Sequence, residues 1–278
     1  MKIFDQWQHW FPVAPNREVV AQRLSRFYAE SHEYHDMTSG GDKTKDPQVA
    51  LLSSLLVPGG HYAEVGCGGG VVCRLVADVA NVVGMDISEI ALCSARERCA
   101  GAKGEVRFIQ SSADSLPLPD GAFDGVYSFE VIEHVWEPEG MLREMIRVVK
   151  PGGYILLSTP NRFSLDLHLN KRMAVRFIDL VLAMMRRIYD LASGKTYCHV
   201  PPDFNHGVYP DCDMITAVVP PNIVNFMEKR GCEVVFWDTT YMCALRPGSK
   251  TTLAYQQYAG CPFLRNFGDH LLLCVRKK

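Results

Sequence analysis

The sequence predicts an α/β protein built on a doubly wound parallel sheet with helices on both faces. Short apolar stretches and stretches with helical spacing alternate from residue 61 to residue 158. This alternation is typical of consecutive β-α-β units, in which a helix connects each pair of parallel strands. A glycine-rich turn directly after the first strand supports the assignment, because ligands of such sheets bind at the carboxyl ends of the strands.

The predicted elements follow one another in a regular order. Apolar residues recur at helical spacing over 17–30, and a second predicted helix over 47–57 stops before a Pro-Gly-Gly turn. Between these helices, residues 31–46 are polar and contain glycine, which predicts a loop. The predicted strands then cover 61–66, 82–86, 105–109, 123–130 and 154–158, and the predicted helices cover 69–80, 88–100 and 138–149.

The glycine turn predicts a site for an adenosine-type ligand. Gly66, Gly68 and Gly70 let the backbone turn tightly and approach a ligand, and a helix that starts there points free N–H groups at it. Asp86 lies 20 residues after Gly66, at the end of the next strand, where a carboxylate can accept hydrogen bonds from ribose hydroxyls. A dinucleotide fingerprint would need glycine at the position of Val71, which argues against an NAD-linked oxidoreductase.

Composition limits the partners and the compartment. The chain has 278 residues and a formal net charge of −2, so we expect no nucleic-acid partner. Its ten cysteines include no Cys-x-x-Cys pair, which favours reduced, buried thiols. No apolar run approaches the roughly 20 residues of a membrane span, and residues 1–7 lack the pattern of a signal peptide. We therefore expect a cytoplasmic protein.

Seven stretches of the chain carry a resemblance to one enzyme family. Five are EVGCGGG at 64–70, GMDIS at 84–88, SADSLPLPDGAFD at 112–124, EVIEHV at 130–135 and VKPGGYILLSTPN at 149–161, and two more lie at 221–235 and 268–276. In order and spacing they resemble the class I S-adenosylmethionine-dependent methyltransferases. The resemblance implies a Rossmann-like, mostly parallel sheet with an antiparallel last strand, and it implies S-adenosylmethionine as the cofactor.

The resemblance also implies which residues bind the methionine and ribose parts of the cofactor. The backbone of Gly66, Cys67 and Gly68 would lie against the methionine part. Glu64 would stand near the amino group of the cofactor, at a position where the family carries Asp or Glu. Asp86 would hold the ribose hydroxyls.

For the adenine and the methyl-bearing end, the resemblance implies a second group of residues. Ile87 would pack on the adenine, and the backbone N–H of Ala113 would bind the adenine ring. The family commonly has an acid just before that alanine, whereas this chain has Ser112, so either Ser112 or Asp114 would bind the exocyclic amine. Glu130, or the backbone beside it, would face the methyl-bearing end.

His134 is the predicted catalytic residue. Methyl transfer needs a nucleophile aligned with the carbon–sulfur bond, and an alcohol or phenol acceptor also benefits from a base. His134 lies four residues past the fourth predicted strand, where it could act as that base or cap the turn before the next helix. Together with Glu130 and Glu133 it could also hold a divalent ion, as in similar Glu-x-x-Glu-His motifs of some quinone-type O-methyltransferases and small-RNA 2′-O-methyltransferases. Relatives without a metal carry the same motif, and we assign no metal ligand.

The variable parts of the chain should select the acceptor. We expect residues 1–46 to form a helical arm and lid, and 47–278 to form the methyltransferase domain. An insertion at about 162–220 would provide a helical cap. Within it, residues 171–190 read as a helix with one narrow polar stripe, whose apolar remainder would pack on the protein's own core, an apolar substrate, a second copy or a membrane surface.

Loop residues near these parts are the predicted substrate contacts, namely Tyr34, His35 and His206, with His199 as a further cleft candidate. The predicted function is methyl transfer from S-adenosylmethionine to a small-molecule acceptor at oxygen, with nitrogen and carbon left open. The alternatives are a metal-dependent RNA 2′-O-methyltransferase and a cofactor-binding protein without turnover.

Overall fold

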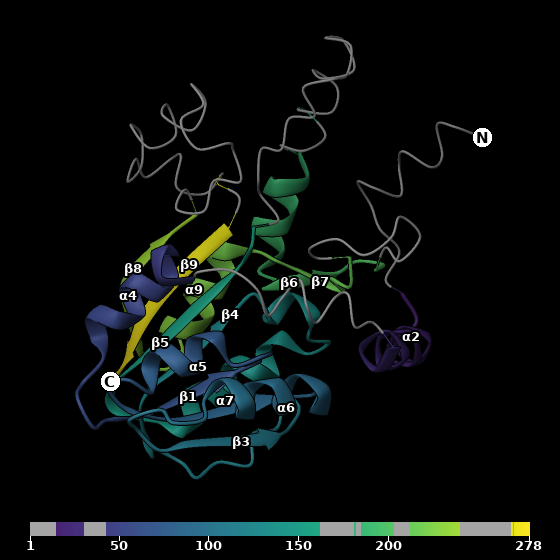
Figure 1. Cartoon of the computed structure of the whole chain (residues 1–278). Coiled ribbons are helices and arrows are strands. Elements are labelled where there is room, and N and C mark those ends of the chain that lie inside the picture. The colour runs from purple at the N-terminus through teal and green to yellow at the C-terminus, as the bar shows by residue number, and fades with distance from the viewer. Residues whose placement is uncertain are drawn as a thin grey trace, which may run out of the picture.

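The computed structural model describes residues 15–30, 43–161, 181, 185–202, 212–239, 268 and 270–278 (Figure 1). Its centre is a seven-stranded sheet with the strand order β3-β2-β1-β4-β5-β9-β8. The strands are β1 (His61–Val65), β2 (Asn81–Asp86), β3 (Val106–Gln110), β4 (Phe123–Phe129), β5 (Val149–Pro160), β8 (Cys232–Asp238) and β9 (His270–Lys277). The first strand, β1, lies in the middle of the sheet. Strands β2 and β3 extend the sheet on one side of it, and the later strands extend it on the other side, which is the doubly wound arrangement.

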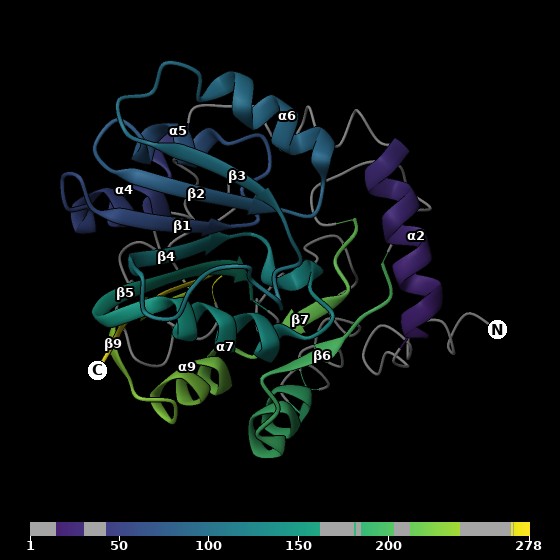
Figure 2. The same ribbon diagram turned by 90° about the horizontal axis from the view of Figure 1, so that it is seen from below.

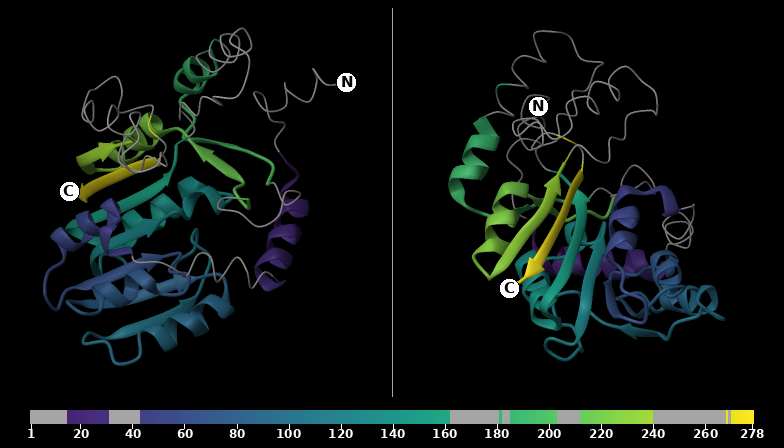
Figure 3. Two further views of the ribbon diagram at one scale, coloured as in Figure 1. Left: turned by 45° about the horizontal axis from the view of Figure 1, so that its top comes forward. Right: turned by 90° about the vertical axis from the view of Figure 1, so that its left-hand side faces the viewer.

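The strand directions match the predicted pattern. Strands β1 to β5 are parallel to one another, and β9 runs antiparallel between β5 and β8, with Leu156 opposite Cys274 (Figure 3). The predicted α/β class and antiparallel last strand are therefore confirmed. Because parallel strands place their carboxyl ends at one edge, the segments after β1, β2, β3 and β4 meet there.

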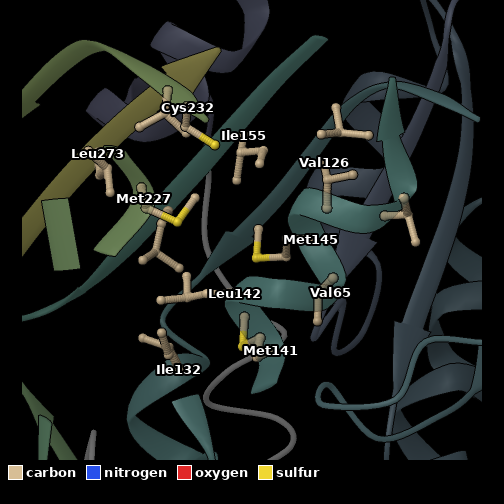
Figure 4. Packing of buried hydrophobic residues seen from close by; sticks show 14 of the residues in the cluster. Val65, Val126, Ile132, Met141, Leu142, Met145, Ile155, Met227, Cys232 and Leu273 are labelled. Carbon is tan, nitrogen blue, oxygen red and sulfur yellow. The ribbon is translucent and has the colours of Figure 1, made fainter. Parts of the chain in front are cut away.

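One face of the sheet is covered by α7 (Pro138–Val148) and α9 (Pro220–Glu228) (Figure 2). Met145 of α7 and Met227 of α9 pack on Ile155 in a cluster of buried side chains (Figure 4). These apolar side chains follow helical spacing on α7 and alternate with residues of the other face along the strands, so they form one continuous layer.

The opposite face carries α4 (Pro47–Leu55), α5 (Val71–Val76) and α6 (Glu89–Arg98) (Figure 2). Leu52 and Leu92 are buried against this face. They form one cluster with side chains of the strands, in which alternate residues point to this face. Helices on both faces complete the three-layer fold that the alternating pattern predicts.

Two elements differ from the predictions by more than two residues at one end. The predicted helix at 69–80 covers only Val71–Val76, and it begins at Val71 because Gly70 precedes it in the left-handed conformation with φ of 72°. Strand β5 starts before residue 154, because Val149 already pairs with Phe123 ahead of an irregularity in the register.

Helix α2 (Arg17–Glu30) lies beyond the carboxyl ends of the parallel strands, beside a two-stranded ribbon (Figure 2). The ribbon pairs β6 (Tyr197–His199) with β7 (Thr216–Val218) in antiparallel fashion. Val20 of α2 packs against Ile215, the residue just before β7. The ribbon is not among the predicted elements, since 162–220 is expected to contribute a helical cap.

The described part of the predicted helix 171–190 is helical over 185–193. In this part of the helix the polar side faces the protein and the apolar side faces outward. Arg187 and Asp190 are buried, whereas Met185 and Ile188 are 61% and 63% exposed. Of the four partners considered for the apolar face, the protein's own core is therefore not the one that covers Met185 and Ile188. Attachment to a membrane surface and a dimer contact through this helix stay predictions. None of the helices in the described ranges has the length and apolar character to cross a membrane.

Candidate active site

A cleft with a volume of about 1110 Å³ opens at the carboxyl ends of the parallel strands. Its walls come from the glycine turn after β1, the segments after β2, β3 and β4, the start of β9 and the inner side of α2. Lining residues from the sequence prediction are Glu64, Gly66, Cys67, Gly68, Asp86, Ile87, Ser112, Ala113, Asp114, Glu130 and His134. The structure therefore brings these candidates to one cleft, and of the described candidates for cofactor or substrate contact only His199 lies outside its lining.

The glycines of the turn have different physical roles. A Cβ at Gly66 would lie 2.3 Å from a side-chain methyl carbon of Val131, and a Cβ at Gly70 would lie 2.8 Å from the Cβ of Ala95. A Cβ at Gly68 would meet no atom within 4 Å, so it would project into open space at the cleft. Gly66 and Gly70 are required by packing inside the protein, and Gly68 keeps space free for a ligand.

Asp86 ends β2 and ties the glycine turn to the start of α6. Its Oδ2 accepts a hydrogen bond from the Gly68 N–H at 2.8 Å, and its Oδ1 accepts one from the Ser88 N–H at 2.9 Å. Ser88 in turn caps α6 by accepting from the Ala91 N–H. Beside this carboxylate, Ile87 is 59% exposed and lines the cleft. An exposed apolar side chain beside a fixed carboxylate suits a ligand with a flat ring and hydroxyl groups.

The segment after β3 presents both candidates for the exocyclic amine. The Ser112 hydroxyl donates a hydrogen bond to Asp114 Oδ1 at 2.5 Å, so the two side chains form one polar unit at the cleft. The family resemblance expects an acid at position 112, and in this unit the carboxylate comes from Asp114, two positions later.

Glu64 is the buried carboxyl group of the site. Its side chain accepts a hydrogen bond from the Tyr127 hydroxyl at 3.1 Å, and only 4% of the residue is exposed. Desolvation by burial raises its pKa from 4.5 to about 8, although hydrogen bonds from Cys73 and Tyr127 oppose the shift. A cation placed next to Glu64 would favour its ionised form.

Glu130 follows β4 directly and has an unusual backbone. Its φ is 56°, a left-handed conformation that is uncommon outside glycine and typical of functional turns. The Ser158 hydroxyl donates to Glu130 Oε1 at 2.5 Å, and His270 Nε2 lies 3.3 Å from Glu130 Oε2. This arrangement joins the ends of β4, β5 and β9 at the cleft.

His134 ends the short 3-10 helix η2 (Ile132–His134) between β4 and α7. Its side chain is 14% exposed and lines the cleft. Nδ1 lies 3.2 Å from Asp213 Oδ2, and Nε2 lies 3.8 Å from Glu133 Oε1. Both carboxylates are almost fully buried, at 0% and 1% exposure. The imidazole therefore stands between two buried acids at the edge of the cleft.

The two carboxylates of the Glu-x-x-Glu-His motif point to different places. Glu130 reaches Ser158 and His270, whereas Glu133 accepts a hydrogen bond from the Thr159 hydroxyl at 2.9 Å. Among the residues that the structure describes, no three His, Cys, Asp or Glu side chains form a metal-binding group. The arrangement does not support the metal alternative that the motif leaves open.

Some site residues lie outside the prediction or outside the described ranges. Tyr34, His35 and His206 fall on residues that the structure does not describe. His199 stacks on Trp136 with ring centroids 4.0 Å apart and is not among the residues that line the cleft.

Sequence reasoning missed Tyr28, Asp213 and His270. His270 opens β9 and lies within the predicted last strand at 268–276, whose antiparallel direction places its start at the cleft edge, so that signal was present in the sequence. Tyr28 and Asp213 left no signal, because only the tertiary fold brings them beside His134.

The comparisons with known proteins agree with this geometry. A family model described as a methyltransferase domain matches residues 63–157. The ubiquinone biosynthesis O-methyltransferase of Methylococcus capsulatus is 36% identical over 178 residues, which are 61% of this chain and 73% of that protein. The ubiquinone/menaquinone biosynthesis C-methyltransferase of Pseudomonas fluorescens is 32% identical over 152 residues, 52% of this chain and 59% of that protein.

Other similar proteins match over shorter stretches or in fold alone. A probable S-adenosylmethionine-dependent methyltransferase of Mycolicibacterium smegmatis is 40% identical over 107 residues, but the match spans only 38% of this chain and 40% of that protein. The crystal structure of an S-adenosylmethionine-dependent methyltransferase from Mesorhizobium loti superposes with a TM-score of 0.53 at 19% identity, covering 82% of this chain and 96% of that one. With its sheet order, its cofactor-type turn and these relatives, the chain belongs to the class I S-adenosylmethionine-dependent methyltransferases, a family of enzymes that use this cofactor.

Proposed function

We propose that this protein transfers a methyl group from S-adenosylmethionine to an oxygen atom of a small aromatic acceptor. The observation that carries the proposal is the division of the cleft into two ends with different chemistry. We call the part formed by Glu64, Gly66–Gly69, Asp86–Ile87 and Ser112–Asp114 the cofactor end. We call the part formed by Glu130, His134, Trp136, Ile215 and His270 the acceptor end. Asp213 is fully buried next to His134 and does not itself line the cleft.

The residues of the cofactor end fit S-adenosylmethionine. The open space in front of Gly68 is the kind of cradle in which a ligand backbone can lie, and Asp86 is held rigidly beside it. Ile87 offers an apolar surface for a flat base. Glu64, whose pKa is raised by burial, would regain its charge beside an ammonium group, so a cationic ligand is favoured there.

At the acceptor end, His134 is the residue suited to move a proton. The bound cofactor supplies a methyl group on a positively charged sulfur, which is already a good electrophile. With that electrophile in place, His134 would take the proton of the acceptor hydroxyl. The proton would then lie on the imidazole, and the acceptor oxygen would be free to accept the methyl group in place of the sulfur. A cleft that holds the two reactants in line would supply much of the acceleration.

The acceptor class follows from the side chains around His134. Trp136, Leu24 and Ile215 line the same cleft, and they offer aromatic and aliphatic surface to a planar acceptor. A hydroxylated ring can pack on such a surface and still present its O–H group to an imidazole. The names of two relatives, an O- and a C-methyltransferase of ubiquinone biosynthesis, support an aromatic acceptor of quinone type.

The test is a turnover assay with labelled S-adenosylmethionine and a panel of phenols, catechols and hydroquinones. We expect S-adenosylhomocysteine and a methyl ether, located by mass spectrometry and NMR. Replacement of His134 by Ala should lower kcat about 10²- to 10⁴-fold with little change in cofactor affinity. His61→Ala, which changes an exposed histidine at the opposite end of β1, is the matched control and should leave kcat unchanged.

Each alternative predicts a different result in this assay. A methyl group on a ring carbon would establish a C-methyltransferase, for which the same base would deprotonate the ring hydroxyl. Binding of the cofactor without S-adenosylhomocysteine for any acceptor would favour a protein without turnover. Equal losses of kcat and cofactor affinity in His134→Ala would contradict the role of the base.

A further inference from the structure

The side chain of Asp213 is the best-buried carboxylate at the acceptor end. It lies on the turn before β7, and the residue has 0% exposure. Its Oδ2 accepts a hydrogen bond from the Tyr28 hydroxyl at 2.6 Å and lies 3.2 Å from His134 Nδ1. Burial of a carboxylate is costly unless polar groups surround it, so a carboxylate kept at this position needs a reason.

The buried atoms between Asp213 and His134 are incompletely hydrogen bonded. Among the described residues, Asp213 Oδ1 and His134 Nδ1 are two of the few buried side-chain polar atoms that lack a hydrogen-bond partner. The ring nitrogen is close to the carboxylate but is not aligned with it. Catalytic hydrogen bonds are commonly misaligned without bound ligands and tighten when the acceptor is present.

Tyr28 connects this pair to helix α2. It lies on the same helix as Val20 and Leu24, which pack on Ile215 two residues after Asp213. Helix α2 therefore contacts the segment 213–215 twice, through the Tyr28 hydroxyl at Asp213 and through apolar packing at Ile215. Residues 185 positions apart in the sequence meet at a single carboxylate oxygen.

We propose that Asp213, held by Tyr28 of α2, is a positioning residue that fixes the proton of neutral His134 on Nδ1 and leaves Nε2 free to accept the proton of the substrate. A carboxylate only accepts hydrogen bonds, so it selects the tautomer that carries a proton on the nitrogen facing it. Two carboxylates face the ring, but Asp213 Oδ2 lies 3.2 Å from Nδ1, whereas Glu133 Oε1 lies 3.8 Å from Nε2, which is beyond hydrogen-bond distance. Nε2 is then the basic nitrogen. The fold thus determines the tautomer of His134, because Tyr28 of α2 holds the carboxylate of Asp213 in place next to Nδ1.

This inference rests on the proposed role of His134 as base, and its first test does not need the acceptor. Long-range ¹H–¹⁵N NMR of histidine-labelled protein should find neutral His134 protonated on Nδ1, with the signal assigned by its loss in His134→Ala. In Asp213→Asn the amide can donate to Nδ1, so the proton should move to Nε2 in a measurable fraction of molecules. Wild-type His134 protonated on Nε2, or an unchanged tautomer in Asp213→Asn, would overturn the proposal.

The second test is a double-mutant cycle in the turnover assay. Asp213→Asn should lower kcat about 10- to 100-fold, and Tyr28→Phe, which keeps the ring on α2, should lower it less. In the His134→Ala background both changes should have no further effect, because they act through the imidazole. Asp238→Asn, at another buried acid, on β8, with 6% exposure, is the control and should keep wild-type kcat.

The outcomes separate this inference from the proposed function. Full turnover in His134→Ala would refute the base, whatever Asp213 does to the tautomer. A large loss in His134→Ala with wild-type kcat in Asp213→Asn would refute only the positioning role. If Asp213→Asn lowered kcat by the same factor in the wild-type and His134→Ala backgrounds, the carboxylate would support the structure of the protein and not the base. Thermal unfolding of each variant checks that the comparison is made on folded protein.

Discussion

The cofactor end of the cleft is built from short pieces of consecutive strands, whereas the acceptor end joins residues that lie far apart in the chain. At the cofactor end, backbone N–H groups of the glycine turn meet a carboxylate from the next strand. At the acceptor end, side chains from α2, η2, the turn before β7 and the start of β9 surround the cleft. The first arrangement needs only local chain geometry and parallel register, and the second needs the complete fold.

The difference also extends to charge. The acceptor end keeps buried acids around one imidazole, while the cofactor end keeps one buried carboxyl group, Glu64, with a raised pKa. An end that binds a common cofactor can rely on a standard turn. The proposed acceptor end needs side chains placed individually, and these come from α2, η2, the segment before β7 and the start of β9.

Gly66 lies where the two ends meet, and its replacement should have the largest effect on stability. In Gly66→Ala the new methyl group would overlap Val131, and the backbone would keep a φ of 75° that disfavours alanine. We expect a loss of about 2–5 kcal/mol in the free energy of unfolding, from left-handed strain and overpacking together. Chemical denaturation measures it.

Gly101 provides the matched control for this change. Gly101 also has a φ of 75°, but its Cβ would meet nothing within 4 Å, so Gly101→Ala should cost only about 1–2 kcal/mol. Adding Val131→Ala to Gly66→Ala should recover the part of the loss that is due to overlap. Equal losses for the two glycines would show that packing against Val131 is not the reason for Gly66.

Glu64 should make the stability of the ligand-free protein depend on pH. Its pKa is about 8 in the folded state against 4.5 ordinarily, so the folded protein holds a proton that the unfolded chain releases. This contribution is fully present below pH 4.5 and is lost as pH rises through 8. We expect the wild type to lose about 2 kcal/mol more than Glu64→Gln between pH 6 and pH 8, measured by urea unfolding. Parallel pH dependences of the two proteins would contradict the raised pKa.

Asp86 should separate cofactor binding from catalysis. In Asp86→Asn the amide oxygen is a weaker acceptor for the Gly68 N–H, and the charge near the ribose site is lost. We expect about tenfold weaker binding of S-adenosylhomocysteine by calorimetry, with kcat at saturating cofactor largely kept. Asp78→Asn, at an exposed acid paired with Arg74, is the control and should change neither quantity. A loss of kcat at saturation would show that the two ends are not independent.

Much of the fold and of the cofactor end could be predicted because the signals are local. Alternation of apolar and helical stretches determines a doubly wound sheet, and a glycine turn followed by Asp86 marks where its ligand lies. The prediction treated the glycines of the turn as one ligand-binding unit. Only the packing of Val131 and Ala95 shows that Gly66 and Gly70 serve the fold, whereas a Cβ at Gly68 would meet no protein atom within 4 Å.

The rest could not be predicted, because long-range contacts leave no mark in a single sequence. The apolar pattern of 171–190 indicates an amphipathic helix, yet it does not say which face meets the protein, and in the described part Met185 and Ile188 face outward. Likewise Tyr28 and Asp213 are unremarkable in their own segments. They become informative only in the folded protein, where the Tyr28 hydroxyl and the His134 imidazole lie next to the buried carboxylate of Asp213. Without these polar neighbours, burial of that carboxylate would be costly.

The sequence by itself determined the α/β class, the family and the residues of the cofactor end, because strand period, glycine turns and motif spacing act within a few residues of one another. The tertiary structure alone decided which groups surround His134, how α2 reaches the cleft and where the carboxylates of the Glu-x-x-Glu-His motif point. Those outcomes depend on burial and on distances between side chains of remote segments, and both quantities exist only once the chain has folded.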